Sequence, residues 1–199
     1  VNLAPSDVRK VGAGLDLAIA VALVAAQGEL PTDALEDLAF LGELGLDGSL
    51  RPLVGMVPLA AACRGRPVVP ASVVAEARLC RPDARFGGSL REVINALRGE
   101  EPWPCGEPPQ LRAAARSSAD LREVRGQAVA RAALEVAAAG GHHALMTGPP
   151  GAGKTMLAER LPGILPELTD DQAMEVTAVH SAAGNLPQGS GLIRQPPMR

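Results

Sequence analysis

The segment Gly148–Thr155, GPPGAGKT, is the feature that most restricts what this chain can fold into. It matches the pattern G-x-x-x-x-G-K-[ST], whose glycines let the backbone curl around a phosphate and direct N–H groups inward. The apolar run His143–Thr147 before it predicts a strand, and we expect a helix after it to about Leu161. Strand, loop and helix in this order predict an α/β domain with a phosphate-binding loop.

Two residues of this segment indicate the ligand. Lys154 can reach the β- and γ-phosphates of a nucleotide, and the Thr155 hydroxyl can ligate Mg²⁺. We therefore interpret the segment as a nucleotide-binding loop and predict ATP and Mg²⁺ as cofactors. The alternative is a Gly/Pro turn that ends in Lys-Thr by chance. The predicted cofactor-binding residues of the loop are Gly148, Pro149, Pro150, Gly151, Ala152, Gly153, Lys154 and Thr155.

No acidic strand motif follows the loop, although hydrolysis needs carboxylates that hold Mg²⁺ and position water, and usually an arginine from a neighbouring subunit. The pair Asp170–Asp171 lies in a capping box, Thr169–Gln172, which predicts a helix through about Val179. Carboxylates are favoured at a helix start, so we interpret this pair as capping. Only 45 residues follow Lys154, and we expect ATP binding without efficient turnover. We assign no catalytic residue.

Residues 1–99 are predicted to form one compact α/β unit. The expected helices cover 16–27, 56–63, 72–78 and 89–97, and the expected strands cover 38–46, 50–54, 67–70 and 84–86. Asp47-Gly48 predicts a hairpin turn, and Ser89 with Glu92 predicts a capping box. The helix over 16–27 is apolar almost all round, which predicts burial on all sides.

Proline recurs over residues 100–117, and because it fixes φ and removes a backbone donor, this stretch is the predicted linker. Trp103, within it, is expected to pack the linker against a domain. Residues 118–199 begin the second unit, with a helix over 127–139 and a loop from Leu186 onward.

The composition excludes several classes. Hydrophobic residues make up 47% and charged residues 21%, a globular balance, and the net charge of −3 argues against a strongly basic nucleic-acid module. No apolar run reaches the roughly 18 residues of a membrane span, and the chain begins with no leader sequence, so we expect a cytoplasmic protein without membrane contact. Cys63, Cys80 and Cys105 form no C-x-x-C pair and are interpreted as reduced thiols, with no metal assigned.

Several motifs in a fixed order resemble one family across nearly the whole chain. They are Val1–Asp7, Gly14–Ala20, Leu41–Leu44, Asp47–Pro52, Ser89–Val93, Val124–Gln127, Ala138–His142, the phosphate loop and His180–Gly184. Together they resemble the Mg-chelatase-like AAA+ ATPases of the YifB/ComM type. The segment Asp120–Gln127 is similar to the AAA+ stretch that lies against adenine, with Val124, Gly126 and Gln127 as candidate binding residues. The alternative for this segment is the ordinary start of a helix.

The resemblance implies a Lon-protease-domain-like α+β domain at residues 1–99, then the first part of an AAA+ α/β domain. It also implies a homo-hexameric ring, with possible DNA contact, and a helicase that promotes branch migration in natural transformation. Lon-type proteases need a Ser–Lys dyad, but the matching loop Gly12–Asp16 has no serine, and Val54–Pro58 has no lysine. We therefore reject peptidase activity. Relative to the family, both ends of the chain look truncated.

Two other functions remain open. The ATPase could instead remodel a protein client, or serve metal insertion as in magnesium chelatase. Residues 1–99 could form a non-catalytic interaction or oligomerisation module, since that half shows no other site.

Overall fold

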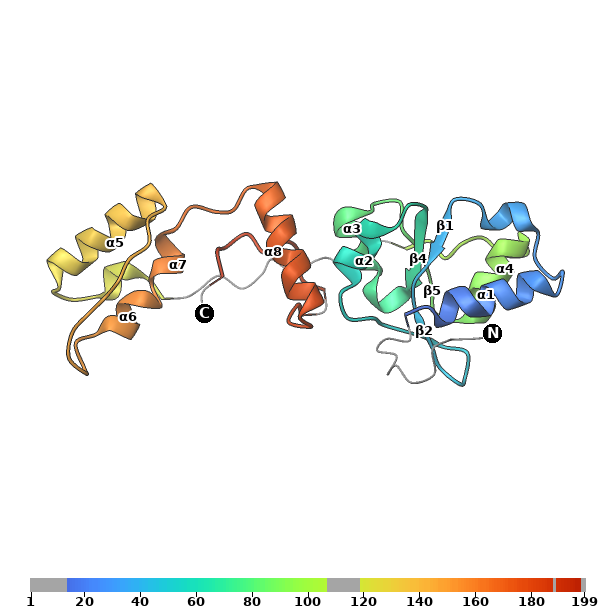
Figure 1. The fold of residues 1–199 in the computed structure, drawn as a ribbon, viewed down its shortest axis with the longest axis horizontal. Coiled ribbons are helices and arrows are strands. Elements are labelled where there is room, and N and C mark those ends of the chain that lie inside the picture. The colour runs from blue at the N-terminus through green and yellow to red at the C-terminus, as the bar shows by residue number, and fades with distance from the viewer. Residues whose placement is uncertain (1–13, 107–118, 188, 198–199) are drawn as a thin grey trace, which may run out of the picture. The chain divides into compact units, whose positions relative to one another are not determined.

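The computed structural model describes residues 14–106, 119–187 and 189–197 (Figure 1). The contacts divide the chain into two compact units. One comprises Val1–Arg112 with Val176–Gly191, and the other comprises Ala113–Glu175 with Leu192–Arg199. The predicted bounds 1–99, 100–117 and 118–199 stay a prediction of domain organisation. The first unit contains both strands and helices, and the described residues of the second contain helices. Each unit has its own apolar core.

The first unit is built on a parallel three-stranded sheet in the order β1-β4-β5. Its strands are β1 (Leu38–Phe40), β4 (Arg66–Pro70) and β5 (Arg85–Gly87). In Figure 1, helices lie on both sides of the sheet. They are α1 (Asp16–Ala26) and α4 (Leu90–Arg98) on one side, and α2 (Met56–Ala62) and α3 (Val74–Cys80) on the other. The α/β prediction is therefore confirmed in this unit, and the parallel pairing of its main sheet is an additional finding.

Strand register decides which side chains face which pair of helices. Val68 pairs with Arg85 and belongs to a core cluster with residues of α1 and α4. Its neighbour Val69 pairs with Phe86 and packs in a second cluster with residues of α2 and α3. Because side chains alternate along a strand, the sheet is buried on both faces at its centre.

The predicted strand over 38–46 is wrong, because it is two short strands in different sheets. After β1 the chain turns at Gly42, whose N–H donates to Gly14 and whose carbonyl accepts from Leu17 at the start of α1. These bonds remove Gly42 from strand pairing. The second piece, β2 (Glu43–Leu44), pairs antiparallel with β3 (Leu50–Arg51). The hairpin turn at Asp47-Gly48 is confirmed, with Gly48 at φ 81°.

The prediction of all-round burial for the first helix is also wrong. Leu17 and Val21 are fully buried on the sheet side of α1, whereas Leu23 is 48% exposed. The apolar sequence therefore covers the sheet with one face only. Trp103, as predicted, packs against the cluster formed by α1, α4 and the sheet.

The predicted capping box at Thr169 forms completely, and the one at Ser89 forms in part. The Ser89 hydroxyl accepts from the N–H of Glu92 at 3.3 Å, while the Glu92 carboxylate accepts from Gly88, one residue earlier than the standard motif. The helix α8 (Asp170–Ala182) has the reciprocal form, since Thr169 and Gln172 each accept from the other's backbone N–H. Local side-chain chemistry thus sets both helix starts.

The second unit surrounds a small apolar core of Leu121, Val124, Leu134 and Leu157. Its helices include the long α5 (Ala128–Gly140) and the short η3 (Leu121–Glu123), α6 (Lys154–Ala158) and α7 (Leu161–Ile164). The predicted helix to Leu161 is wrong in its end, because a new helix starts there with Pro162 in its first turn. The predicted strand His143–Thr147 is wrong for this structure, because these residues belong to no strand and the described residues of this unit offer no strand for them to pair with.

Candidate functional site: a glycine-rich phosphate loop

The loop before α6 turns on glycines that no other residue replaces without strain. Gly151 and Gly153 have φ of 77° and 79°, in the left-handed region. A Cβ on Gly153 would also lie 2.8 Å from Nε2 of Gln127. The chain therefore curls sharply just before Lys154, the first residue of α6.

The Lys154 ammonium is folded back over this curl. Its Nζ donates to the carbonyl oxygens of Gly148 at 2.8 Å and Pro149 at 2.9 Å. An ammonium group has three donors, so two of them hold the loop in its curled form. A positive charge thus lies against the backbone turn, which is the arrangement that a phosphate group requires.

Thr155 follows in the first turn of α6 and is exposed. Pro149, Pro150, Gly151 and Ala152 are exposed as well, so the outer side of the loop is open to solvent. A cavity of about 300 Å³ adjoins the loop, and Gln127, Thr147, Ala152 and Lys154 contribute to its wall. Lysine, hydroxyl and glycine-turned backbone together fit a nucleotide phosphate with its Mg²⁺.

The three candidates for adenine contact have different surroundings. Gln127, at φ 50°, donates from Nε2 to the carbonyl of Ala152 at 3.4 Å, so the structure brings it against the loop. Gly126 precedes it, exposed and at φ 73°. Val124 is 3% exposed and packs in the core with Leu157 of α6. Val124 therefore fastens this segment to the helix that follows the loop.

Arg160 is a residue that sequence reasoning missed. Its guanidinium donates to the Asp120 carbonyl at 3.1 Å and the Met156 carbonyl at 2.9 Å, and pairs with Glu123 at 3.0 Å. It thereby ties the segment that carries Gln127 to α6. The motif ends at Thr155, and Asp120 and Glu123 lie 40 and 37 residues upstream of Arg160, so no local pattern indicates this role.

The acidic pair Asp170–Asp171 lies in the first turn of α8, where the capping interpretation placed it, and Asp170 pairs with Arg194 at 2.8 Å. Within the described ranges, no group of three His, Cys, Asp or Glu side chains could hold a metal ion. All three cysteines are free thiols. No helix of the described part of the chain is both long and apolar enough to cross a bilayer.

Two family models match the chain. "Magnesium chelatase, subunit ChlI" covers residues 120–199, and "Subunit ChlI of Mg-chelatase" covers residues 1–75. An uncharacterized protein of Mycobacterium tuberculosis is 46% identical over 98% of this chain. Competence protein ComM of Haemophilus influenzae is 40% identical over 93%, and the uncharacterized YifB of Salmonella typhimurium is 43% identical over 91%. The chain spans 36–40% of the length of these relatives.

Proposed function

The chain belongs to the Mg-chelatase-like family that includes YifB and ComM, and from this premise we propose that it is the ATP-binding portion of an AAA+ ATPase. The observation that carries the proposal is the position of Lys154, whose ammonium lies on two carbonyls of a glycine-turned loop. A triphosphate supplies the anionic oxygens that such a loop lacks. Charge-assisted hydrogen bonds from an ammonium to phosphate are about twice as strong as neutral ones.

Each residue has its own part in this proposal. Lys154 would bind β- and γ-phosphate oxygens in place of the loop carbonyls, and the Thr155 hydroxyl would be a ligand for Mg²⁺, which would neutralise phosphate charge. Gln127 lies against Ala152 and defines the side of the loop on which the base is held. Arg160 keeps that segment in place.

For the whole protein we propose a homo-hexameric, cytoplasmic DNA motor that promotes branch migration during natural transformation. The support is the 40% identity to a protein named competence protein ComM. We further propose that the first unit is a Lon-like domain without protease chemistry, which serves interaction rather than catalysis. Its motifs resemble that family while the Ser–Lys dyad has no counterpart in the sequence.

The nucleotide site is tested by titrating the chain with a fluorescent ATP analogue and Mg²⁺. Lys154→Ala should weaken binding at least about tenfold, since it removes a charged hydrogen-bond donor worth roughly 1.5–3 kcal/mol. Lys10→Ala is the matched control, because it removes the only other lysine and the same charge. Equal binding by both variants would overturn the assignment of the loop.

The DNA assignment needs the full-length protein. Its ATPase rate should rise several-fold with branched DNA and less with linear duplex of the same length. A rate that no DNA changes would redirect the proposal to a protein client or to metal insertion, while leaving the nucleotide site intact.

A further inference from the structure

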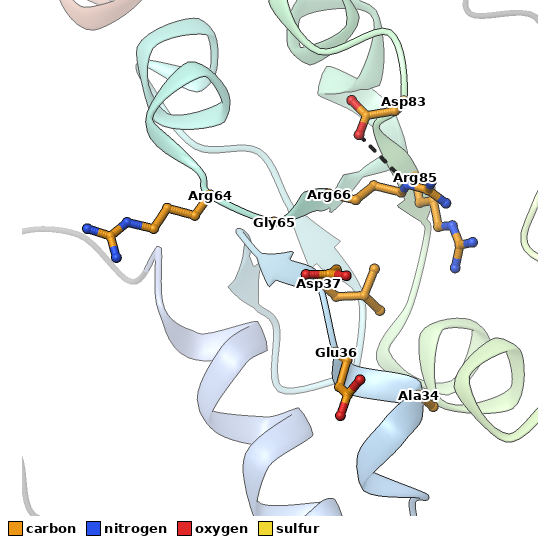
Figure 2. Close-up of a pocket in the computed structure, with 9 residues that line it drawn as sticks. Ala34, Glu36, Asp37, Arg64, Gly65, Arg66, Asp83 and Arg85 are labelled. Atoms are coloured by element: carbon orange, nitrogen blue, oxygen red, sulfur yellow. Dashed lines mark ion pairs between the residues drawn. The ribbon is translucent and has the colours of Figure 1, made fainter.

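A pocket with charged walls lies where the three parallel strands of the first unit begin. Its volume is about 340 Å³, and its charged residues are Glu36, Asp37, Arg64, Arg66, Asp83 and Arg85 (Figure 2). Arg66 and Arg85 are the first residues of β4 and β5. The amino edge of the sheet therefore gathers cationic side chains that are distant in the sequence.

The register places Arg66 and Arg85 on the same face. Arg85 pairs with Val68, and Val68 is two residues beyond Arg66, so all three side chains lie on one side of the sheet. Figure 2 shows Arg66 and Arg85 side by side, while Arg64 is directed away from them. Two guanidinium groups are thus held near each other, an arrangement that costs energy without an anion between them.

The carboxylate nearest to this pair is already bound by a third arginine. Asp83 makes two contacts of 3.0 Å with Arg81, and Arg66 approaches it only at 3.7 Å. Arg85 instead lies over the Trp103 ring, 4.8 Å from its centroid. Burial, and then the charge of Arg66, lower the pKa of Arg85. Arg66 and Arg85 therefore carry more positive charge than the Asp83 carboxylate neutralises.

The floor of the pocket is fixed by a close backbone approach. Asp37 has φ 60°, rare for a residue other than glycine, and its carbonyl accepts from the N–H of Arg66. A Cβ on Gly65 would lie 2.6 Å from the same carbonyl oxygen. In Figure 2, Asp37 and Glu36 form the wall opposite Arg66 and Arg85. One wall thus offers guanidinium donors, and the other offers carboxylate acceptors.

We propose that this pocket binds the phosphate group of a nucleotide, either free or within a nucleic-acid strand. Arg66 and Arg85 would hold phosphate oxygens with their planar forks, and stacking on Trp103 orients the fork of Arg85. Glu36 and Asp37 would accept from an exocyclic amino group of the base, as carboxylates do from cytosine N4. This site is separate from the phosphate loop and does not depend on ATP binding there.

The test uses the chain with Lys154→Ala, so that the phosphate loop does not contribute. Calorimetry measures binding of deoxycytidine monophosphate, and fluorescence anisotropy measures an end-labelled oligodeoxycytidylate. Arg66→Ala with Arg85→Ala should weaken binding at least about tenfold, because the two charged donors are removed. Arg51→Ala with Arg91→Ala is the matched control, since it removes the same charge from exposed positions of the same unit.

The two ligands separate the possible sources of the phosphate. Binding of the mononucleotide alone identifies a free nucleotide. Oligonucleotide binding identifies the strand, and the log–log slope of its salt dependence should then fall by about 0.7 for each phosphate that the pocket variant no longer neutralises. Binding of either ligand that disappears in the pocket variant and persists in the control supports the proposal.

Arg66→Gln is a second variant that tests binding without disturbing the fold, because the Arg66 side chain is 44% exposed and its replacement leaves the core unchanged. It should weaken binding several-fold alone. The proposal is overturned if the Lys154→Ala chain binds neither ligand, or if Arg66→Gln binds as tightly as the control.

Discussion

Glu76 is a single carboxyl group buried in α3, with 8% of the residue exposed. Burial disfavours its charged form and raises its pKa above the ordinary value. The native state therefore keeps this proton to a higher pH than the unfolded chain does. Stability falls as pH rises from the ordinary glutamate pKa to the raised native one, and the loss persists at neutral pH.

Glu76→Gln should therefore raise the melting temperature more at about pH 7 than at about pH 4, where the native carboxyl is already protonated. Thermal melts of both proteins at the two pH values measure this difference. Glu135→Gln is the control, because this side chain of α5 is exposed and its replacement should change the melting temperature little. A gain from Glu76→Gln that is equal at both pH values would contradict the assignment.

Single residues also show where sequence reasoning stops. Lys154 and Thr155 are candidates that the sequence alone supplies, because they belong to a contiguous motif, and Gln127 is a candidate because a short segment resembles a family. The role of Arg160 could not be predicted from the sequence, since its partners Asp120 and Glu123 are far upstream in the chain. The proximity of Arg66 and Arg85 could not be predicted either, because only the pairing of β4 with β5 brings them together.

At the scale of elements, what could be predicted was local. The hairpin turn at Asp47-Gly48 and the capping at Ser89 and Thr169 depend on residues within a few positions. The strand predicted over 38–46 failed at Gly42, whose backbone bonds go to the start of α1. A hydrophobic pattern cannot indicate such a distant partner. For the same reason, the apolar run His143–Thr147 predicts a strand but does not show whether a second strand pairs with it.

Arg160 connects the segment around η3 to α6 through its contacts with Asp120, Glu123 and Met156. Arg160→Ala should weaken binding of a fluorescent ATP analogue about three- to tenfold, because it releases the segment that presents Gln127. The loop and Lys154 stay, so binding should not be abolished. Arg122→Ala is the control, since its pair with Asp120 is in the same segment and its side chain is 85% exposed. Equal affinities for the two variants would refute this role of Arg160.

For the whole molecule, the separate cores allow the two units to be followed independently. The single tryptophan, Trp103, packs in the first unit, so its fluorescence reports unfolding there. The phosphate loop belongs to the second unit, whose core is a different cluster. Far-UV circular dichroism reports the helices of both units, and the comparison of the two signals assigns any shift to one of them.

Mg²⁺-ATP should stabilise the second unit by about 2.7 kcal/mol at a concentration 100 times its dissociation constant, because a ligand that binds only the folded state raises stability by mass action. The helical transition of that unit should move to higher temperature, while the Trp103 midpoint stays within error. Lys154→Ala should abolish the shift without changing either midpoint in the absence of nucleotide. Equal shifts in both signals would instead mean that the two units unfold together, and would contradict their independence.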